Sequence, residues 1–250
     1  MKVTGNTILI TGGATGIGFA LAQQFVQLGN EVIICGRREN RLAEAKQKIP
    51  GLHCKVCDLA RAPDRKELYE WTVGNFPGLN MLINNGAYQN DYSLTDGLAA
   101  LDGAEEEINV ILTSPILLNA LFTEHLRNIP DAAIVNVTSI LGFMPSSRIP
   151  VYCAAKAGFH TYTLVLRKQF EKAGIAIKVF EAPPPRVDTE LNMIGREKAG
   201  YANIPGGMSP PEYAGFVIDK IKSDELDIFY GKAGEDARFQ PRAEVERSRL

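Results

Sequence analysis

The chain alternates short apolar runs with stretches in which apolar residues recur every three or four positions. The short runs predict buried strands, and the longer repeats predict amphipathic helices. Because strands that alternate with helices are typical of βαβ units, the pattern predicts an α/β fold with a doubly wound parallel sheet, helices on both faces and one domain over residues 1–250. Strands are expected at 8–10, 31–35, 52–57, up to 84, 132–138, 175–180 and 227–230, and helices from 17, up to 49, at 63–76, at 100–128, from 152 and from 209.

The first predicted strand leads into a glycine-rich turn, Thr11-Gly12-Gly13-Ala14-Thr15-Gly16-Ile17-Gly18, and a helical pattern follows. Glycines permit positive φ and let a ligand approach the backbone, so N–H groups at the helix start can bind phosphate. The spacing is G-x-x-x-G-x-G and differs from the common dinucleotide fingerprint G-x-G-x-x-G. The strand–turn–helix context favours phosphate binding over a purely structural tight turn.

The second predicted strand ends at Gly36-Arg37-Arg38. At this point of a dinucleotide fold an acidic residue binds the ribose 2′-hydroxyl of NAD, whereas arginine accommodates the 2′-phosphate of NADP. Glycine occupies the acidic position here and two guanidinium groups follow it, which favours NADP. The alternative interpretation is that both arginines belong to a solvated helix start.

Three residues suited to proton transfer lie at and after the fifth predicted strand. Ser139 follows that strand, at the sheet edge where open α/β folds bind their ligands. Tyr152 and Lys156 are spaced i, i+4 at the start of a predicted helix, so they share one helical face. A free phenol has a pKa of about 10, and an adjacent cation lowers it. Ser139 would then bind a substrate oxygen while Tyr152 gives or takes its proton.

Together these motifs resemble the classical short-chain dehydrogenase/reductase family to about residue 190: a T-G-x-x-x-G-I-G turn, Asn84-Asn85, and Ser139 thirteen residues before a Y-x-x-x-K pair. The resemblance implies a Rossmann-type fold and an NADP(H)-dependent oxidoreductase, with NAD(H) as the alternative, that interconverts a carbonyl and an alcohol on a small molecule. It implies catalysis by Ser139, Tyr152 and Lys156, with Lys156 also holding the nicotinamide ribose. The cofactor-binding residues that it implies are Gly12, Ala14, Thr15, Gly16, Ile17, Gly18, Arg37, Arg38, Asp58, Leu59, Asn85, Gly86, Tyr152, Lys156, Val187 and Thr189.

Three positions depart from the family pattern. Gly86-Ala87 exchanges the usual Ala-Gly, which would cost about 1 kcal/mol if the alanine needed positive φ. Ile111 stands where the family has a catalytic asparagine, unless the helix differs by one residue in register, and Asn109 lies on roughly the opposite helical face. Pro185 replaces a glycine and has no N–H to donate. These departures favour an alternative function as a dinucleotide-binding sensor with weak or no turnover.

Composition argues against several other classes of function. The net charge of −2 and the lack of a long basic block give no electrostatic signature of nucleic-acid or membrane binding. The C-x-x-C stretch at 54–57 lies in a predicted strand without a second cysteine pair or a histidine cluster, so we interpret it as strand packing and expect no metal. His53, His125 and His160 are interpreted as packing or surface residues.

Location, mobile segments and assembly are expected as follows. The chain leads directly into its first strand and has no apolar run of membrane-spanning length, so a cytoplasmic location is expected. Glycine and proline between about 190 and 208 indicate a substrate lid, although an ordinary surface loop has the same composition. The polar segment at about 232–250 is expected to form a loose or subunit-docked tail. By resemblance, the helices at 100–128 and from Tyr152 build a homodimer or homotetramer.

Overall fold

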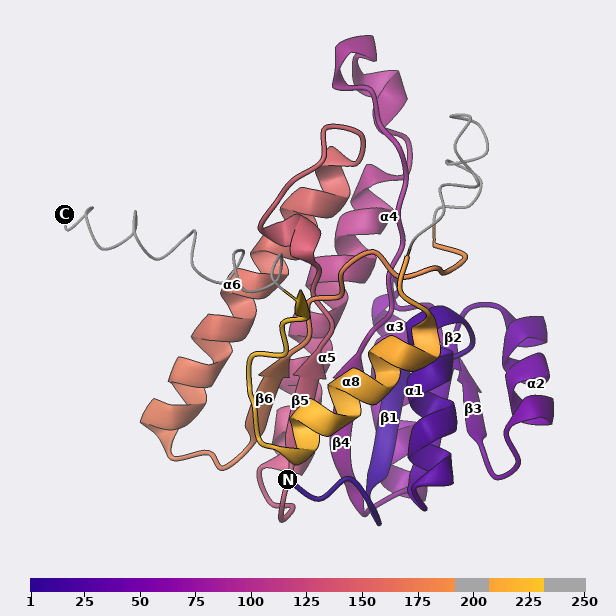
Figure 1. Ribbon diagram of the computed structural model, residues 1–250, viewed down its shortest axis with the longest axis vertical. Helices are drawn as coiled ribbons and strands as arrows, with labels where there is room; N and C mark the ends of the chain where they lie inside the picture. Colours follow the sequence, from indigo (N-terminus) through magenta and orange to yellow (C-terminus); the bar gives the residue numbers. More distant parts are fainter. Residues whose placement is uncertain (192–206, 232–250) are drawn as a thin grey trace.

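The structure, a computed structural model, describes residues 1–191 and 207–231. Its described strands form one parallel sheet in the order β3-β2-β1-β4-β5-β6, with helices on both faces (Figure 1). The strands are β1 Thr7–Thr11, β2 Glu31–Gly36, β3 His53–Val56, β4 Leu79–Asn84, β5 Ala133–Asn136 and β6 Lys178–Glu181. This architecture confirms the doubly wound parallel sheet that the hydrophobic pattern predicts and the Rossmann-type fold that the family resemblance implies.

Alternation along β1 divides the core between the two faces of the sheet. Ile8 and Ile10 belong to one core, which is completed by helices α1, α2 and α8, whereas Leu9 belongs to the other, completed by α3, α5 and α6. All three side chains are fully buried. Successive strand residues point to opposite faces, so one short apolar run supplies both cores. The helices are α1 Gly16–Gln27, α2 Glu39–Lys48, α3 Ala62–Asn75, α4 Ala104–Ile108, α5 Ser114–Leu126, α6 Pro150–Ala173 and α8 Pro210–Lys222.

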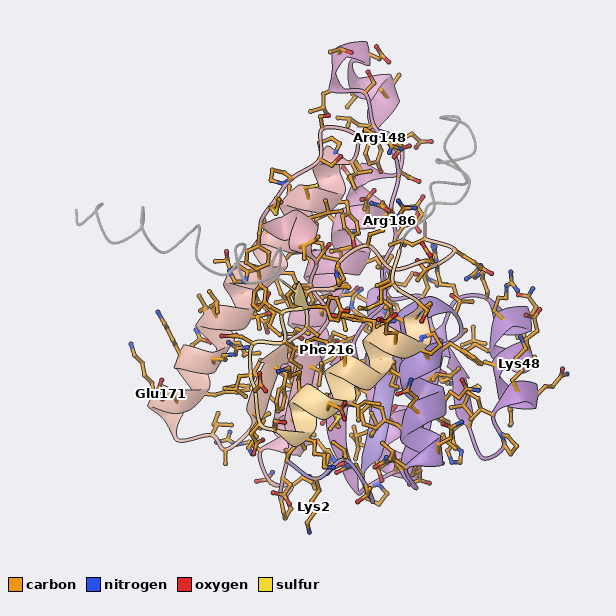
Figure 2. All side chains as sticks on the ribbon, viewed as in Figure 1. Lys2, Lys48, Arg148, Glu171, Arg186 and Phe216 are labelled. Atoms are coloured by element: carbon orange, nitrogen blue, oxygen red, sulfur yellow. The ribbon has the colours of Figure 1, made fainter. Side chains whose placement is uncertain are left out.

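The strand order reverses at β1, which pairs with β2 on one side and with β4 on the other. In open sheets of this kind the crevice at the carboxyl ends of the two diverging strands binds the ligand. Figure 2 shows Arg186 and Arg148 on this side of the molecule, whereas Lys2 lies at the opposite end. The topology therefore places the glycine turn after β1, the Asn-Asn segment after β4 and the serine after β5 along one edge.

The long helix expected at 100–128 is divided in the structure. A 3₁₀ turn, η2 (Leu98–Leu101), precedes α4, and a π-helical segment, η3 (Asn109–Thr113), separates α4 from α5. Pro115 accounts for the interruption, because it has no N–H for the carbonyl of residue 111 and its ring clashes with that carbonyl. The expected helical segment is present, but its central turn is widened where it contacts α6.

The carboxyl-terminal part of the described chain also differs from expectation. A helix does begin at Pro210, where the Ser209 hydroxyl accepts the Glu212 N–H at 3.3 Å. The strand expected at 227–230 is only an isolated bridge between Asp227 and Glu181, because β6 ends at Glu181 and offers no further partner. The lid expected at 190–208 and the tail expected at 232–250 fall mainly or wholly outside the described residues.

Candidate active site

The glycine turn packs so closely against the segment after β4 that side chains would not fit. Gly12 has a φ of +63°, and a Cβ on it would lie 2.8 Å from the Gly86 Cα. A Cβ on Gly18 would lie 2.5 Å from both the Asn85 Nδ2 and the Gly12 oxygen. Asn85 Nδ2 in turn donates to the Thr11 and Gly12 carbonyls at 3.0 and 3.2 Å. This contact explains why glycines are required here and joins β1 and β4 at the predicted cofactor crevice.

The first turn of α1 keeps its backbone donors available. Thr15 occupies the N-cap position, but its side chain makes no capping hydrogen bond within the described residues. Gly16 has a φ of +57°, and the Thr189 methyl group would lie 3.1 Å from a Cβ placed there. Uncapped N–H groups at a helix start bind phosphate, and the surrounding glycine cradle leaves backbone accessible. These residues therefore fit the pyrophosphate of a dinucleotide.

Arg37 and Arg38 point in different directions from the end of β2. The Arg38 guanidinium donates to the Thr15 hydroxyl at 3.4 Å and lies 3.6 Å from Glu190. Arg37 forms an ion pair with Glu106 on the distant helix α4 and lies 5.7 Å from the Tyr88 ring centroid. Both arginine side chains are about half exposed, at 45% and 56%. Arg38 is thus the arginine that borders the glycine turn.

Leu59, predicted with Asp58 to bind the cofactor, lies against the segment after β4. A Cβ on Gly86 would lie 2.6 Å from the Leu59 Cδ1, so close approach rather than φ requires glycine there. The Asp58 carboxylate accepts the Ala60 N–H at 3.0 Å. The strain considered for Ala87 is absent, because in the described ranges only two non-glycine residues have positive φ, and both lie elsewhere. The Ala–Gly exchange is therefore accommodated without backbone strain.

Ser139, Tyr152 and Lys156 come together at the carboxyl end of β5. The Ser139 hydroxyl caps the short 3₁₀ helix η4 (Ile140–Gly142) by accepting the Leu141 N–H at 3.1 Å, and it also hydrogen-bonds Tyr152. Lys156 Nζ donates to the Val137 carbonyl at 2.8 Å and lies 5.7 Å from the Tyr152 ring centroid. All three side chains are buried, at 4%, 5% and 2% exposure. The structure therefore brings the predicted catalytic residues into one cluster.

Burial shifts the protonation equilibria of the cluster. Burial raises the pKa of Tyr152, and the hydrogen bond from Ser139 opposes this only in part. Burial also lowers the pKa of Lys156 to about 7. In the protein without cofactor, burial disfavours both the phenolate and the ammonium ion, and acidification of the phenol by Lys156 together with a cationic nicotinamide ring stays a prediction. Without cofactor the phenol therefore stays protonated.

The residue at the family's asparagine position faces this cluster. Ile111 is buried in an apolar group with Ile149, Tyr152, Cys153 and Ala155. It lies on η3, the π-helical segment that precedes Pro115. The position therefore belongs to the same buried apolar group as Tyr152, and its side chain can neither hold water nor relay a proton.

Sequence reasoning missed one buried carboxyl group whose charge acts on Tyr152. Glu107 is fully buried on α4, its Oε2 accepts the Asn90 N–H at 3.2 Å, and its Oε1 lacks a hydrogen-bond partner among the residues described. Burial raises its pKa to about 7, against the effects of the Tyr92 hydroxyl and the Asn90 N–H. Its charge in turn raises the pKa of Tyr152. An acidic run at a helix start is usually solvated, so the pattern held no signal for this residue.

The loop after β6 contains the remaining predicted cofactor residues. Val187 is buried and forms an isolated bridge with Met208, and the Asp188 N–H donates to the Met208 carbonyl at 2.9 Å. The Ile140 N–H, next to the catalytic serine, donates to the Pro184 carbonyl at 3.2 Å. Pro185 supplies no N–H. The loop is therefore held against both the glycine turn and the serine.

Cysteines and histidines were interpreted from the sequence as structural. Cys57 is buried and Cys54 partly buried, and across residues 1–191 and 207–231 no group of three metal-ligating side chains gathers. His125 Nε2 contacts the Leu79 carbonyl at 3.0 Å, and His53 lies 3.4 Å from Glu31. None of the described helices is long and apolar enough to cross a bilayer.

Comparison with known proteins gives the family. The family model described as short chain dehydrogenase matches residues 6–200. The chain is 45% identical over 249 residues to the protein named uncharacterized oxidoreductase DltE of Bacillus subtilis, covering 99% of this chain and 96% of that protein. It is 26% identical to L-fucose dehydrogenase of Bos taurus over 70% of this chain and 64% of that protein. The chain belongs to the short-chain dehydrogenase/reductase family and is an oxidoreductase of that family.

Solved structures agree with this assignment at the level of the fold. A short-chain dehydrogenase/reductase from Burkholderia phymatum in complex with NAD superimposes with a TM-score of 0.87 at 17% identity, covering 100% of this chain and 97% of that one. A short-chain dehydrogenase from Sphingobium yanoikuyae in complex with NADPH gives a TM-score of 0.81 at 24% identity, covering 98% and 96%. The two neighbours carry different nicotinamide dinucleotides.

Proposed function

We propose that the protein is an NADP(H)-dependent oxidoreductase that interconverts a carbonyl and an alcohol on a small molecule. The observation that carries this proposal is the buried cluster of Ser139, Tyr152 and Lys156 at the carboxyl end of β5. The glycine turn and α1 start lie on the same sheet edge, two strands away. A proton donor and a dinucleotide cradle on one edge are the parts that hydride chemistry requires.

Each member of the cluster has a separate task. Ser139 donates a hydrogen bond to the substrate oxygen, and Tyr152 donates its proton to that oxygen during reduction or receives it during oxidation. Lys156, anchored on the Val137 carbonyl, holds the nicotinamide ribose. When bound, the nicotinamide dinucleotide supplies or accepts the hydride.

The preference for NADP(H) rests on charge at the end of β2. Arg38 borders the glycine turn through Thr15, and Arg37 follows directly on Gly36, where an acidic residue would bind the NAD ribose. A guanidinium binds phosphate through several donors in a fixed geometry, so either arginine suits a 2′-phosphate. NAD(H) remains the alternative cofactor.

The proposed activity is tested by titrating the protein with NADPH, followed by fluorescence, and then by measuring NADPH oxidation with a panel of aldehydes and ketones. Binding with turnover is the expected result. Binding without turnover across the panel would favour the second candidate, a dinucleotide-binding sensor. That candidate is favoured by Ile111, which places an apolar side chain against the catalytic tyrosine.

We further propose that two or four copies of the chain assemble through α5 and α6. Leu117 on α5 and Val165 on α6 are apolar and about 41% and 46% exposed, which fits helix faces covered by a second copy. Light scattering during size-exclusion chromatography gives the mass directly. A cytoplasmic location stays a prediction from the sequence.

A further inference from the structure

Three polar side chains repeat along one face of α6, the helix that packs beside the segment after β5. Tyr152, Lys156 and His160 are spaced by four residues, so they lie one above the other on the helix. Tyr152 hydrogen-bonds Ser139, and Lys156 Nζ donates to the Val137 carbonyl. His160 continues this series beyond the two residues that carry the proposed chemistry.

His160 is linked to Thr138, which follows β5, through the buried carboxylate of Glu181. Its Nδ1 lies 2.9 Å from both oxygens of Glu181, and Glu181 Oε1 accepts the Thr138 hydroxyl at 2.8 Å. The Glu181 side chain is 1% exposed and that of His160 is 17% exposed. A carboxylate only accepts hydrogen bonds, so the imidazole hydrogen lies on Nδ1. Thr138 directly precedes the catalytic serine.

His160 also contacts the chain on the other side of the serine. The Phe143 ring, which follows η4, lies 4.3 Å from the His160 ring centroid and 5.5 Å from that of Phe229. The segment 138–143 is thus held at its first residue by a hydrogen bond and at its last residue by a ring contact. Both contacts connect the segment to His160, the first through Glu181 and the second directly.

We propose that His160 and Glu181 are positioning residues that hold Thr138, and thereby the Ser139 hydroxyl, in the geometry required for the proposed carbonyl reduction. The inference rests on the proposed function, because Ser139 must bind the substrate oxygen for its position to matter. The serine lies on a loop after a strand, where neighbouring contacts decide the direction of the side chain. α6 then sets all three parts of the site: phenol, ammonium group and serine.

The simpler alternative is that the His160–Glu181 pair only stabilises the end of β6. Removing the Thr138 hydroxyl distinguishes the two possibilities, because this hydroxyl is the contact through which the His160–Glu181 pair would hold the serine segment. Thr163 offers a matched control on the same helix: its hydroxyl is fully buried, accepts from Asn136 Nδ2 at 3.0 Å and donates to the Phe159 carbonyl at 2.8 Å. Thr138→Val and Thr163→Val therefore each remove one buried, hydrogen-bonded hydroxyl.

The experiment compares the wild-type protein with Thr138→Val, Thr138→Ser and Thr163→Val. It measures kcat and KM for the carbonyl compound reduced fastest in the panel, the NADPH Kd, and amide hydrogen exchange over residues 137–143. Thr138→Val is expected to lower kcat about ten- to a hundred-fold with the NADPH Kd unchanged. Exchange at Ile140 and Leu141 is expected to accelerate. Thr138→Ser should restore both properties, and Thr163→Val should leave both near wild type.

Wild-type kcat and wild-type exchange in Thr138→Val would overturn the inference, as would equal losses in Thr163→Val. A loss of kcat without faster exchange would also count against it, because the serine segment would then be undisturbed. If the wild-type protein binds NADPH but reduces no carbonyl in the panel, the proposed function fails. Hydrogen exchange then still decides whether Thr138 holds the serine segment.

Discussion

Burial determines the chemistry of individual residues in this site more than charge pairing does. Tyr152 and Lys156 are both almost completely buried, and burial raises the pKa of the phenol while lowering that of the lysine to about 7. An i, i+4 spacing predicts that the two groups are neighbours, but it carries no information on how dry their surroundings are. The neutral phenol is consistent with a proton donor that acts when a carbonyl is reduced.

Tyr152→Phe tests the proton donor. The substitution keeps the ring packing and removes the hydroxyl, so turnover should fall by at least about a hundred-fold while the NADPH Kd stays within about two-fold of wild type. Steady-state kinetics and fluorescence titration measure the two quantities. Tyr162→Phe, on the same helix and outside the cluster, is the matched control. Substantial activity in Tyr152→Phe would mean that another group supplies the proton.

Arg38→Ala and Arg37→Ala test the cofactor preference. Loss of Arg38 should weaken NADPH binding about ten-fold or more and change NADH binding little, because the guanidinium would pair with the 2′-phosphate. Arg37→Ala should also weaken NADPH far more than NADH. Lys172→Ala, at the end of α6, removes a comparable charge away from the site. Equal losses for the two dinucleotides would contradict the preference for NADP(H).

Glu107 makes stability depend on pH in a definite direction. Burial raises its pKa from 4.5 to about 7, so between these values the unfolded chain has lost a proton that the folded protein retains. Stability from this group therefore falls as the pH rises from about 4.5 to 7 and then levels off. Glu107→Gln should gain in Tm relative to wild type over that window, measured by thermal unfolding. Parallel Tm curves, or the same gain in the exposed control Glu105→Gln, would contradict this account.

At the scale of elements, apolar periodicity predicted the strands of the sheet. It did not predict the π-helical turn or the isolated bridge. Short apolar runs predicted the strands, and all of them except β3 consist mainly of buried residues in the structure. The π-helical turn depends on Pro115 inside an otherwise regular apolar repeat, and the bridge at Asp227 depends on where β6 ends. Glu107 and Glu181 are buried by packing from distant segments, and a local pattern does not register that packing.

Ile111→Asn tests the widened turn between α4 and α5. An amide here would face Tyr152 and could hold water, so kcat should rise several-fold if proton exchange limits turnover. Burying the amide should cost about 1–3 kcal/mol of stability, measured by denaturant unfolding. Ile111→Val is the control, because it changes the packing without adding a polar group. An unchanged kcat in a folded Ile111→Asn protein would show that the site works without that amide.

At the scale of the whole molecule, topology gathers residues that lie far apart in the sequence. The order β3-β2-β1-β4-β5-β6 puts the strand ends that precede Gly12, Asn85 and Ser139 side by side. Contacts such as Gly12 with Gly86 then leave backbone exposed where a dinucleotide would lie. The family pattern predicted these positions, whereas the clamp of His160, Glu181 and the Thr138 hydroxyl was visible only in the folded molecule.

The most direct test of the account is a crystal structure of the protein with bound NADP⁺. The pyrophosphate should lie on the α1 start, and C4 of the nicotinamide ring should lie within roughly 6 Å of the Tyr152 hydroxyl, because reacting atoms stand about 3–3.5 Å apart and one carbonyl group must fit between. A nicotinamide ring held more than roughly 10 Å from that hydroxyl would contradict the account, since no small carbonyl could then reach both hydride and proton.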